Sequence, residues 1–487
     1  MQNKTLLELA NDWLVEATID DIQEKYTKNE LTAKELVLMY LHRISTYDAT
    51  LKSILEINPD ALQIAMALDV ERKVNGPRGP LHGIPVLLKD NLDTNDKMHT
   101  SAGSLALADS YAVEDSYVAS LLRKAGAIIL GKTNMTEWAN FMTEGMPNGY
   151  SSRGGQTLNP YGPGKFDVGG SSAGSGSAIA ANLGVVAVGT ETSGSILNPS
   201  NQNSLVGIKP TVGLVSRSGI IPIAHTQDTA GPMARTVKDA TYLLSAMAEV
   251  DNRDPITSTS RVLPSYDFTR FLDVDGLKGA RIGIAREFYF DYLSEEKRAV
   301  MNKAVTDLEN LGAIVIEDIK IPSTKNKWSY DVLTYEFKVD LNAYLRRLDP
   351  SIKVRNLTEL IKFNKQNKEK MLKYGQILLE KAEQTSGTLV EKEYIKALEN
   401  DHYQSTINGI DYVLKKHHLD AIVFPSYVGS AIPAKAGYPS ITVPAGYTPE
   451  GEPVGITFTG TAYSEGLLIK LAYSYEQGTK HRVPPKL

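Results

Sequence analysis

The run GGSSAGSGSAIAANLGVVAVGTETSGS spans Gly169–Ser195 and contains two serine-bearing glycine turns. Between the turns, the sequence predicts a helix over 177–182 and a buried strand over Leu183–Val188. Upstream, the strand-like apolar run Ile84–Leu88 ends in Lys89. Glycine turns expose backbone N–H groups, serines supply nucleophiles, and a lysine in a dry pocket can accept a proton. These are the parts needed to cleave an amide or ester through an acyl-enzyme.

The same order of helix and buried strand recurs along the chain. Thr32 and Glu35 form a capping-box pattern that predicts a helix through Ile44, and Asp115 is expected to cap a helix that ends at Gly126. Further buried strands are expected over 127–130, 313–316 and 421–424, the last two after helices over 295–311 and 407–417. The alternation predicts an α/β fold, with a mixed central sheet flanked by helices on both faces.

Composition excludes several classes of function. The 487 residues carry a net charge of −5, so nothing indicates binding to nucleic acid or to an anionic membrane. There is no cysteine, which removes disulfides, thiolate nucleophiles and thiolate metal sites. No apolar stretch reaches the length of a membrane helix, and the acidic N-terminal stretch lacks a signal-peptide core. We therefore expect a cytoplasmic protein, with a removed export signal left open.

Residues from about 325 to 400 differ from the rest of the chain in composition. They are rich in lysine, glutamate and tyrosine and have helical periodicity, and the stretch Asp331–Leu345 carries Tyr335, Phe337 and Tyr344. The segment is expected to form a helical excursion that covers one side of the sheet. A sharper hypothesis is that it also covers a substrate cleft, with its aromatic residues lining the cleft.

The residues alone leave the choice of nucleophile open. Ser195 follows an apolar strand and lies among small residues, but a solvated turn has the same pattern. Gly170–Gly174 matches G-x-S-x-G, so Ser172 could instead be the nucleophile of an α/β-hydrolase, with His225 as a candidate base. A phosphate-binding loop is excluded because the run lacks the G-K-[ST] ending.

Taken together, these motifs resemble the amidase signature family of serine hydrolases. The resemblance is carried by GIPVLLKDN around Lys89, by GGSSAGSGSA and GTETSGSI with Ser171 and Ser195 24 positions apart, and by GIKPT, QDTAGPMAR and AGYPS further on. It extends from about residue 31 to the end of the chain, with a signature core over about 70–245. The resemblance implies a single amidase domain over 1–487.

The resemblance implies a catalytic triad of Ser195, Ser171 and Lys89. Ser195 would attack the amide carbonyl, and Ser171, after a cis Gly170–Ser171 peptide bond, would pass the proton to neutral Lys89. Ser172 and Gly170 would support this arrangement. The implied oxyanion hole consists of the backbone N–H groups of Thr192, Ser193, Gly194 and Ser195. Neither a metal nor a cofactor is implied.

Departures from the common family run G-T-D-[TI]-G-G-S-I-R bear on the substrate. Glu191, Ser193 and Leu197 differ from it, and Glu191 together with VGLVSRSGIIPI looks closer to the peptide amidase branch. The expected partner is therefore a small amide or a C-terminally amidated peptide. The alternative is the A subunit of a tRNA-dependent amidotransferase, whose typical arginine is Leu197 here. No obligate partner subunit is expected. A catalytically inactive binding protein is disfavoured because all three triad positions are filled.

Overall fold

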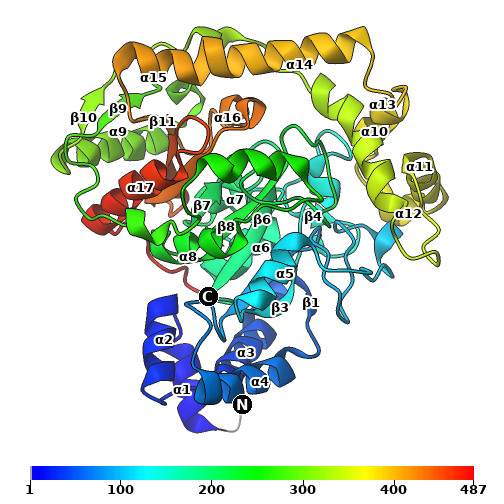
Figure 1. Ribbon diagram of the computed structural model, residues 1–487, viewed down its shortest axis with the longest axis vertical. Helices are drawn as coiled ribbons and strands as arrows, with labels where there is room; N and C mark the ends of the chain where they lie inside the picture. Colours follow the sequence, from blue (N-terminus) through cyan, green and yellow to red (C-terminus); the bar gives the residue numbers. More distant parts are fainter. Residues whose placement is uncertain (1–2) are drawn as a thin grey trace.

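A computed structural model describes residues 3–487 of the chain, and its centre is one large sheet (Figure 1). Within these residues the sheet has 11 strands in the order β1-β3-β2-β6-β8-β7-β12-β13-β11-β9-β10, and β4 and β5 form a separate hairpin. The strands are β1 (Ile54–Ile57), β2 (Pro85–Lys89), β3 (Ile128–Thr133), β4 (Tyr150–Ser151), β5 (Gly155–Gln156), β6 (Val186–Glu191), β7 (Val206–Lys209), β8 (Thr229–Ala234), β9 (Arg281–Ile284), β10 (Ile314–Ile316), β11 (Ala421–Pro425), β12 (Ser440–Tyr447) and β13 (Pro453–Thr459).

The sheet is mixed, as predicted. β2 pairs in parallel with both β3 and β6, whereas β8 pairs antiparallel with β6 and β7. Every residue of β2, β3 and β6 is buried, because helices cover both faces. Strands buried on two faces need nearly continuous apolar sequence, which explains the runs that were recognisable in the chain. The chain therefore forms a single α/β domain.

Helices cover the sheet in two layers. The first layer is a row of helices in mutual contact, α5 (Tyr117–Lys124), α8 (Val237–Met247), α17 (Glu465–Thr479) and α9 (Glu295–Asn310). The second contains α6 (Ala173–Ala180) and α7 (Leu197–Gln202), which pack against each other and the central strands. Four N-terminal helices lie at one end of the molecule (Figure 1): α1 (Lys4–Asn11), α2 (Ile19–Thr27), α3 (Ala33–Leu51) and α4 (Ala61–Asn75). Among residues 3–487, no helix combines the length and apolar character needed to cross a bilayer.

Some of the predicted helix and strand boundaries are confirmed, and others differ from the structure. Thr32 and Glu35 form the expected capping box, but the helix continues to Leu51. The prediction for Asp115 is wrong: Ser116 caps α5, while the Asp115 carboxylate forms an ion pair with Arg123 at 3.0 Å. In the opening run, the helix begins at Ala173 and the strand at Val186, a few residues from the predicted positions. Local patterns therefore located these elements better than they located their ends.

The helical excursion is confirmed as helical. It contains α10 (Asp331–Leu345), α11 (Leu357–Gln366), α12 (Lys368–Met371), α13 (Ile377–Glu383) and α14 (Lys392–Ser405), and α15 (Asp411–His417) and α16 (Ala431–Ala436) lead back to the sheet. In Figure 1, α10–α13 lie beside the core and α14 crosses the top. Phe337 and Leu341 of α10 pack with Trp138, Phe141 and Met146 of the core in a separate apolar cluster. This cluster attaches the excursion at the edge where β2 and β6 end.

Close packing between β7 and β8 predicts a severe cost for one added methyl group. A Cβ at Gly231 would lie 2.1 Å from the Ile208 carbonyl oxygen and 2.9 Å from Ile196, next to the Ser195 turn. We expect Gly231→Ala to destabilise the protein by about 3 kcal/mol, because the paired strands must separate. Thermal unfolding measures this, with Gly79→Ala as control since a Cβ there meets nothing within 4 Å. Equal midpoints for the two variants would contradict the packing argument.

Candidate active site

The side-chain amine of Lys89 is fully buried and is surrounded by oxygen atoms. It is the last residue of β2 and has no exposed surface. Its Nζ lies 2.7 Å from Ser171 Oγ, 3.0 Å from Ser172 Oγ and 2.8 Å from Thr190 Oγ1. The parallel pairing of β2 with β6 brings Lys89 to the end of β6, where Thr190 lies. The structure thus brings together Lys89, Ser171 and Ser172 as the sequence predicted, and it adds Thr190.

Burial changes the acidity of Lys89. Loss of hydration lowers the pKa of Lys89 to about 7, although the carboxylates of Asp228 and Glu191 act in the opposite direction. A neutral amine is therefore well populated near neutral pH. In that form Nζ can accept a proton from Ser171, which is its shortest contact.

The Gly170–Ser171 peptide bond is cis, as expected from the resemblance. A Cβ on Gly170 would lie 2.6 Å from Thr136 Oγ1 and 2.8 Å from Asn148 Oδ1, so only glycine fits there. Backbone bonds then hold the segment on both sides: Thr136 N donates to Ser171 O at 3.0 Å, and Ser172 N donates to Ser195 O at 3.2 Å. The two serine-bearing turns of the opening run are therefore in direct contact.

The turn after β6 presents a row of free donors. Within residues 3–487, none of the backbone N–H groups of residues 192–195 has a hydrogen-bond acceptor. Glu191 stabilises the end of this turn, because its Oε1 accepts hydrogen bonds from Ile196 N at 2.8 Å and Leu197 N at 2.9 Å. Ser195 is 8% exposed and opens onto a cleft, whereas Ser171 and Ser172 have no exposed surface. No hydrogen bond joins Ser195 Oγ to Ser171 Oγ in this structure.

We call this opening the Ser195 cleft, a cavity of about 400 Å³. Its apolar and aromatic wall is formed by Phe141, Met146, Ile223, Tyr330, Leu333, Leu378 and Tyr427. Leu333 and Leu378 come from the excursion helices α10 and α13. The excursion therefore lines the cleft into which Ser195 opens. The aromatic residues singled out in the sequence, Tyr335, Phe337 and Tyr344, do not line it.

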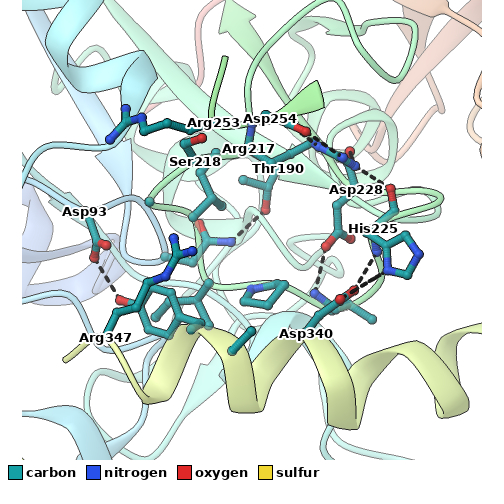
Figure 2. Close-up of a pocket in the computed structure, with 18 of the residues that line it drawn as sticks. Asp93, Thr190, Arg217, Ser218, His225, Asp228, Arg253, Asp254, Asp340 and Arg347 are labelled. Atoms are coloured by element: carbon teal, nitrogen blue, oxygen red, sulfur yellow. Dashed lines mark hydrogen bonds and ion pairs between the residues drawn. The ribbon is translucent and has the colours of Figure 1, made fainter. Parts of the chain in front are cut away.

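A second cavity, the α10 pocket, lies between the core and α10 and measures about 260 Å³ (Figure 2). It shares Ala139, Thr192 and Ile223 with the Ser195 cleft. Asp228 lines it and accepts a hydrogen bond from Thr192 Oγ1 at 2.5 Å. Burial raises the pKa of Asp228 to about 6. Asp228 thus joins the turn at residues 192–195 to the wall of the second cavity.

Comparison with known proteins shows the family to which the chain belongs. The family model described as Amidase matches residues 35–469. The chain belongs to the amidase family. It is 42% identical to a probable amidase of Arabidopsis thaliana, over 97% of this chain and 91% of that protein. Amide hydrolysis is therefore its class of activity.

Solved amidase structures share the whole fold. An amidase family protein from Bacillus anthracis is 41% identical with a TM-score of 0.94, covering 100% of this chain and 95% of that one. The peptide amidase of Stenotrophomonas maltophilia is 44% identical with a TM-score of 0.91, covering 97% and 98%. Among sequence relatives, the A subunit of the glutamyl-tRNA(Gln) amidotransferase of Rippkaea orientalis is 31% identical over 97% of this chain and 100% of that protein.

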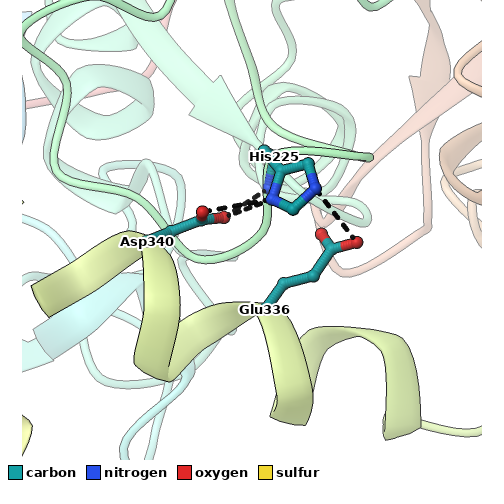
Figure 3. Close-up of side chains that lie close together, drawn as sticks. All are labelled: His225, Glu336 and Asp340. Carbon is teal, nitrogen blue, oxygen red and sulfur yellow. Dashed lines mark hydrogen bonds and ion pairs between the residues drawn. The ribbon is translucent and has the colours of Figure 1, made fainter. Parts of the chain in front are cut away.

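In this amidase, the interpretation of Ser172 as an elbow nucleophile gains no support. Ser172 Oγ donates to Thr190 O at 3.0 Å and accepts from Thr190 N at 3.2 Å, deep below the cleft. The candidate base, His225, has its ring between two carboxylates of α10 (Figure 3). Its Nδ1 faces Asp340 at 2.9 Å and its Nε2 faces Glu336 at 3.6 Å. One metal ion cannot bind both ring nitrogens, so this geometry suits an ion-paired imidazolium better than a metal site.

Two residues that contact the site lie within the sequence motifs but were not predicted from them. Asp228 lies within QDTAGPMAR, and Thr190 lies within GTETSGSI. Their contacts with Thr192 and Lys89 depend on strand pairing and not on chain proximity. Both motifs contain several polar residues, so no local signal set Asp228 or Thr190 apart from its neighbours.

His225 predicts a pH-dependent attachment of α10. Its hydrogen bond to Asp340 raises the pKa of His225, assisted by Glu336 and opposed by burial and Arg217. A raised folded-state pKa gives stability that is complete below the unfolded value of about 6.5 and is lost as pH rises through the folded value. We expect His225→Gln to unfold at a lower temperature than wild type at pH 6, with the deficit shrinking by pH 9. His42→Gln is the control, and an equal His225→Gln deficit at both pH values would contradict the assignment.

Proposed function

We propose that this amidase hydrolyses a carboxamide to a carboxylate and ammonia through an acyl-enzyme on Ser195, with Ser171 and Lys89 as its proton relay. The observation that carries the proposal is the buried Lys89 amine, 2.7 Å from Ser171 Oγ and below a turn whose four N–H groups, at residues 192–195, have no acceptor among residues 3–487. A serine hydroxyl needs a base to become an effective nucleophile. In this proposal Lys89 is that base.

The proposed reaction begins when Ser195 Oγ attacks the amide carbonyl. Its proton passes to Ser171 Oγ, whose own proton passes to neutral Lys89 Nζ. Since no hydrogen bond joins the two serines in the free enzyme, rotation of the Ser195 side chain must form one when substrate binds. The N–H groups of residues 192–195 stabilise the oxyanion, and the relay then returns the proton to the departing nitrogen. Water cleaves the acyl-enzyme by the same route.

We further propose that the substrate is a C-terminally amidated peptide. The likeness to the peptide amidase of Stenotrophomonas maltophilia, at 44% identity over nearly the whole chain, supports this choice. The apolar wall contributed by Phe141, Leu333 and Leu378 suits an amino-acid side chain on the acyl side. In this proposal the excursion, residues 325–400, covers the substrate cleft of a single amidase domain.

The alternative function is that of the A component of a tRNA-dependent amidotransferase. The 31% identity to the Rippkaea orientalis protein over its full length supports this alternative. Leu197 stands where that branch typically has arginine, and the higher identity to the peptide amidase favours a self-sufficient hydrolase. Glutaminase activity that appears only with added partner subunits would favour the alternative.

Ammonia release from a panel of amidated dipeptides, glutamine and simple amides tests the proposal. We expect amidated dipeptides to be the best substrates. Ser195→Ala, Ser171→Ala and Lys89→Ala should each lower kcat at least about 10³-fold, because the nucleophile or its proton relay is lost.

Ser177→Ala is the matched control, since this buried α6 serine donates only to the Leu158 carbonyl at 2.7 Å. It should retain most of the activity. An active Ser195→Ala variant would falsify the mechanism, whereas hydrolysis of simple amides alone would refute only the peptide-amide assignment.

The lowered pKa of Lys89, about 7, predicts how kcat/KM depends on pH below neutrality. Because the neutral amine is the active form, kcat/KM should rise about tenfold per pH unit below pH 7 and level off above it. Steady-state kinetics between pH 5 and 9 measure this. A profile without an inflection near neutrality would argue against Lys89 as the base.

A further inference from the structure

Asn91 is buried beside the proposed base and leaves part of its side chain without a partner. It follows Lys89, the end of β2, by two positions and is 2% exposed. Its Nδ2 donates to Thr190 Oγ1 at 2.9 Å, whereas its Oδ1 has no partner among residues 3–487. A buried amide oxygen without a hydrogen bond is costly, and the orientation of an asparagine amide is set by the bonds that it can make.

The Thr190 hydroxyl joins Asn91 to Lys89. Lys89 Nζ lies 2.8 Å from Thr190 Oγ1, and within residues 3–487 only Lys89 and Asn91 make hydrogen bonds with this oxygen. A hydroxyl has one hydrogen to donate and two lone pairs with which to accept. When Lys89 and Asn91 both donate to Thr190, its own hydrogen has no acceptor other than the lone pair of a neutral Lys89.

Lys89 can be the base only if its lone pair faces Ser171. A neutral amine has two N–H groups and one lone pair, which Lys89 Nζ must divide among its three short contacts. Ser172 Oγ donates its hydrogen to Thr190 O at 3.0 Å, so it is left to accept from Lys89. The second N–H then has Thr190 Oγ1 as its acceptor, since Thr190 O lies further away, at 3.3 Å, and already accepts from Ser172. The lone pair is free for Ser171 only when the Thr190 hydrogen points elsewhere.

We propose that Asn91 is a positioning residue that keeps the Lys89 lone pair free for Ser171, by accepting the Thr190 hydrogen with its amide oxygen. The inference rests on the proposed function, in which neutral Lys89 is the base. In the reactive state the Asn91 amide is reversed from the orientation described above, which gives Oδ1 the partner that it lacks. Hydrogen bonds then run in one direction, from Lys89 to Thr190 and from Thr190 to Asn91.

The two orientations of the amide have opposite effects on the charge of Lys89. With the Asn91 oxygen toward Thr190, the Thr190 oxygen is free to bind an ammonium group, which favours charged Lys89. With the nitrogen toward Thr190, the hydroxyl hydrogen points at the Lys89 lone pair and favours the neutral amine. Removal of the amide therefore lowers the pH at which Lys89 loses its proton in the first case and raises it in the second. The two carboxylates that act on Lys89, those of Asp228 and Glu191, stay the same throughout.

The rate at which a fluorophosphonate probe labels Ser195, measured from pH 5 to 9, tests the inference without knowledge of the natural amide. Asn91→Leu keeps the approximate volume of the side chain but removes both polar atoms. We expect its plateau rate to fall about fivefold to tenfold and its acidic inflection to fall by about half a pH unit, because one hydrogen bond is lost. Asn91→Asp keeps the acceptor and adds a negative charge, so its inflection should rise while its plateau rate stays within about threefold of wild type.

Thr190 variants test whether Asn91 acts through this hydroxyl. Thr190→Val removes the hydroxyl, so the double variant with Asn91→Leu should label no more slowly than Thr190→Val alone. Thr190→Ser keeps the hydroxyl, and its inflection should lie near the wild-type pH. If Asn91→Leu does not fold, Asn91→Asp decides the question, since a plateau loss of about tenfold or more in that variant overturns the acceptor role.

Asn58→Leu is the matched control. Asn58 also follows a strand, β1, is also 2% exposed, and donates to Ile129 O at 2.9 Å with no hydrogen bond to Lys89 or Thr190. Its inflection should stay in place. A raised or unmoved inflection in Asn91→Leu overturns the proposed orientation, and further slowing in the double variant overturns the action through Thr190. Wild-type enzyme that is not labelled at Ser195 overturns the proposed function itself, and this inference with it.

Discussion

The burial of Lys89 is the constraint on which the rest of the site depends. An amine without exposed surface loses the hydration that stabilises its charged form, and three hydroxyl groups replace only part of it. This environment requires β2 and β6 to lie side by side, so that Thr190 reaches Lys89 from the next strand. It also requires Ser171 and Ser172 to bring their hydroxyl groups below the cleft.

The surroundings of the turn at residues 192–195 are built from distant parts of the chain. Glu191, at the end of β6, accepts from Ile196 N, and Asp228, just before β8, accepts from Thr192 Oγ1. Asp228 Oδ2 also accepts from Ile223 N at 2.8 Å and Ala224 N at 2.9 Å, within the loop that carries His225. Since His225 pairs with α10, a continuous chain of contacts links the excursion to the turn. Attachment of the excursion and geometry of the turn are thus parts of one network.

Much of the fold could be predicted from local patterns, because buried strands must be apolar on both faces. The strand that ends at Lys89 and the excursion helix Asp331–Leu345 lie where the sequence predicted them. The predicted cap of α5 was wrong, since Asp115 and Ser116 are both good capping residues. In the fold, Arg123 and the Asn95 N–H group bind the Asp115 carboxylate, and Ser116 caps the helix. Of the aromatic residues singled out on α10, Tyr344 lines the α10 pocket, whereas Phe337 packs in an apolar cluster.

The sequence by itself determined the family, the mixed α/β fold and the candidates Lys89, Ser171 and Ser195, since these depend on motifs and spacing. Tertiary structure alone decided how these residues lie relative to one another and to the cleft. Ser172 lost its role as a candidate nucleophile because it is buried beneath the cleft, while Ser195 opens onto it. Thr190 became relevant because β2 and β6, far apart in the chain, end side by side. Charge and hydration depend on such distances in space, which a linear pattern does not contain.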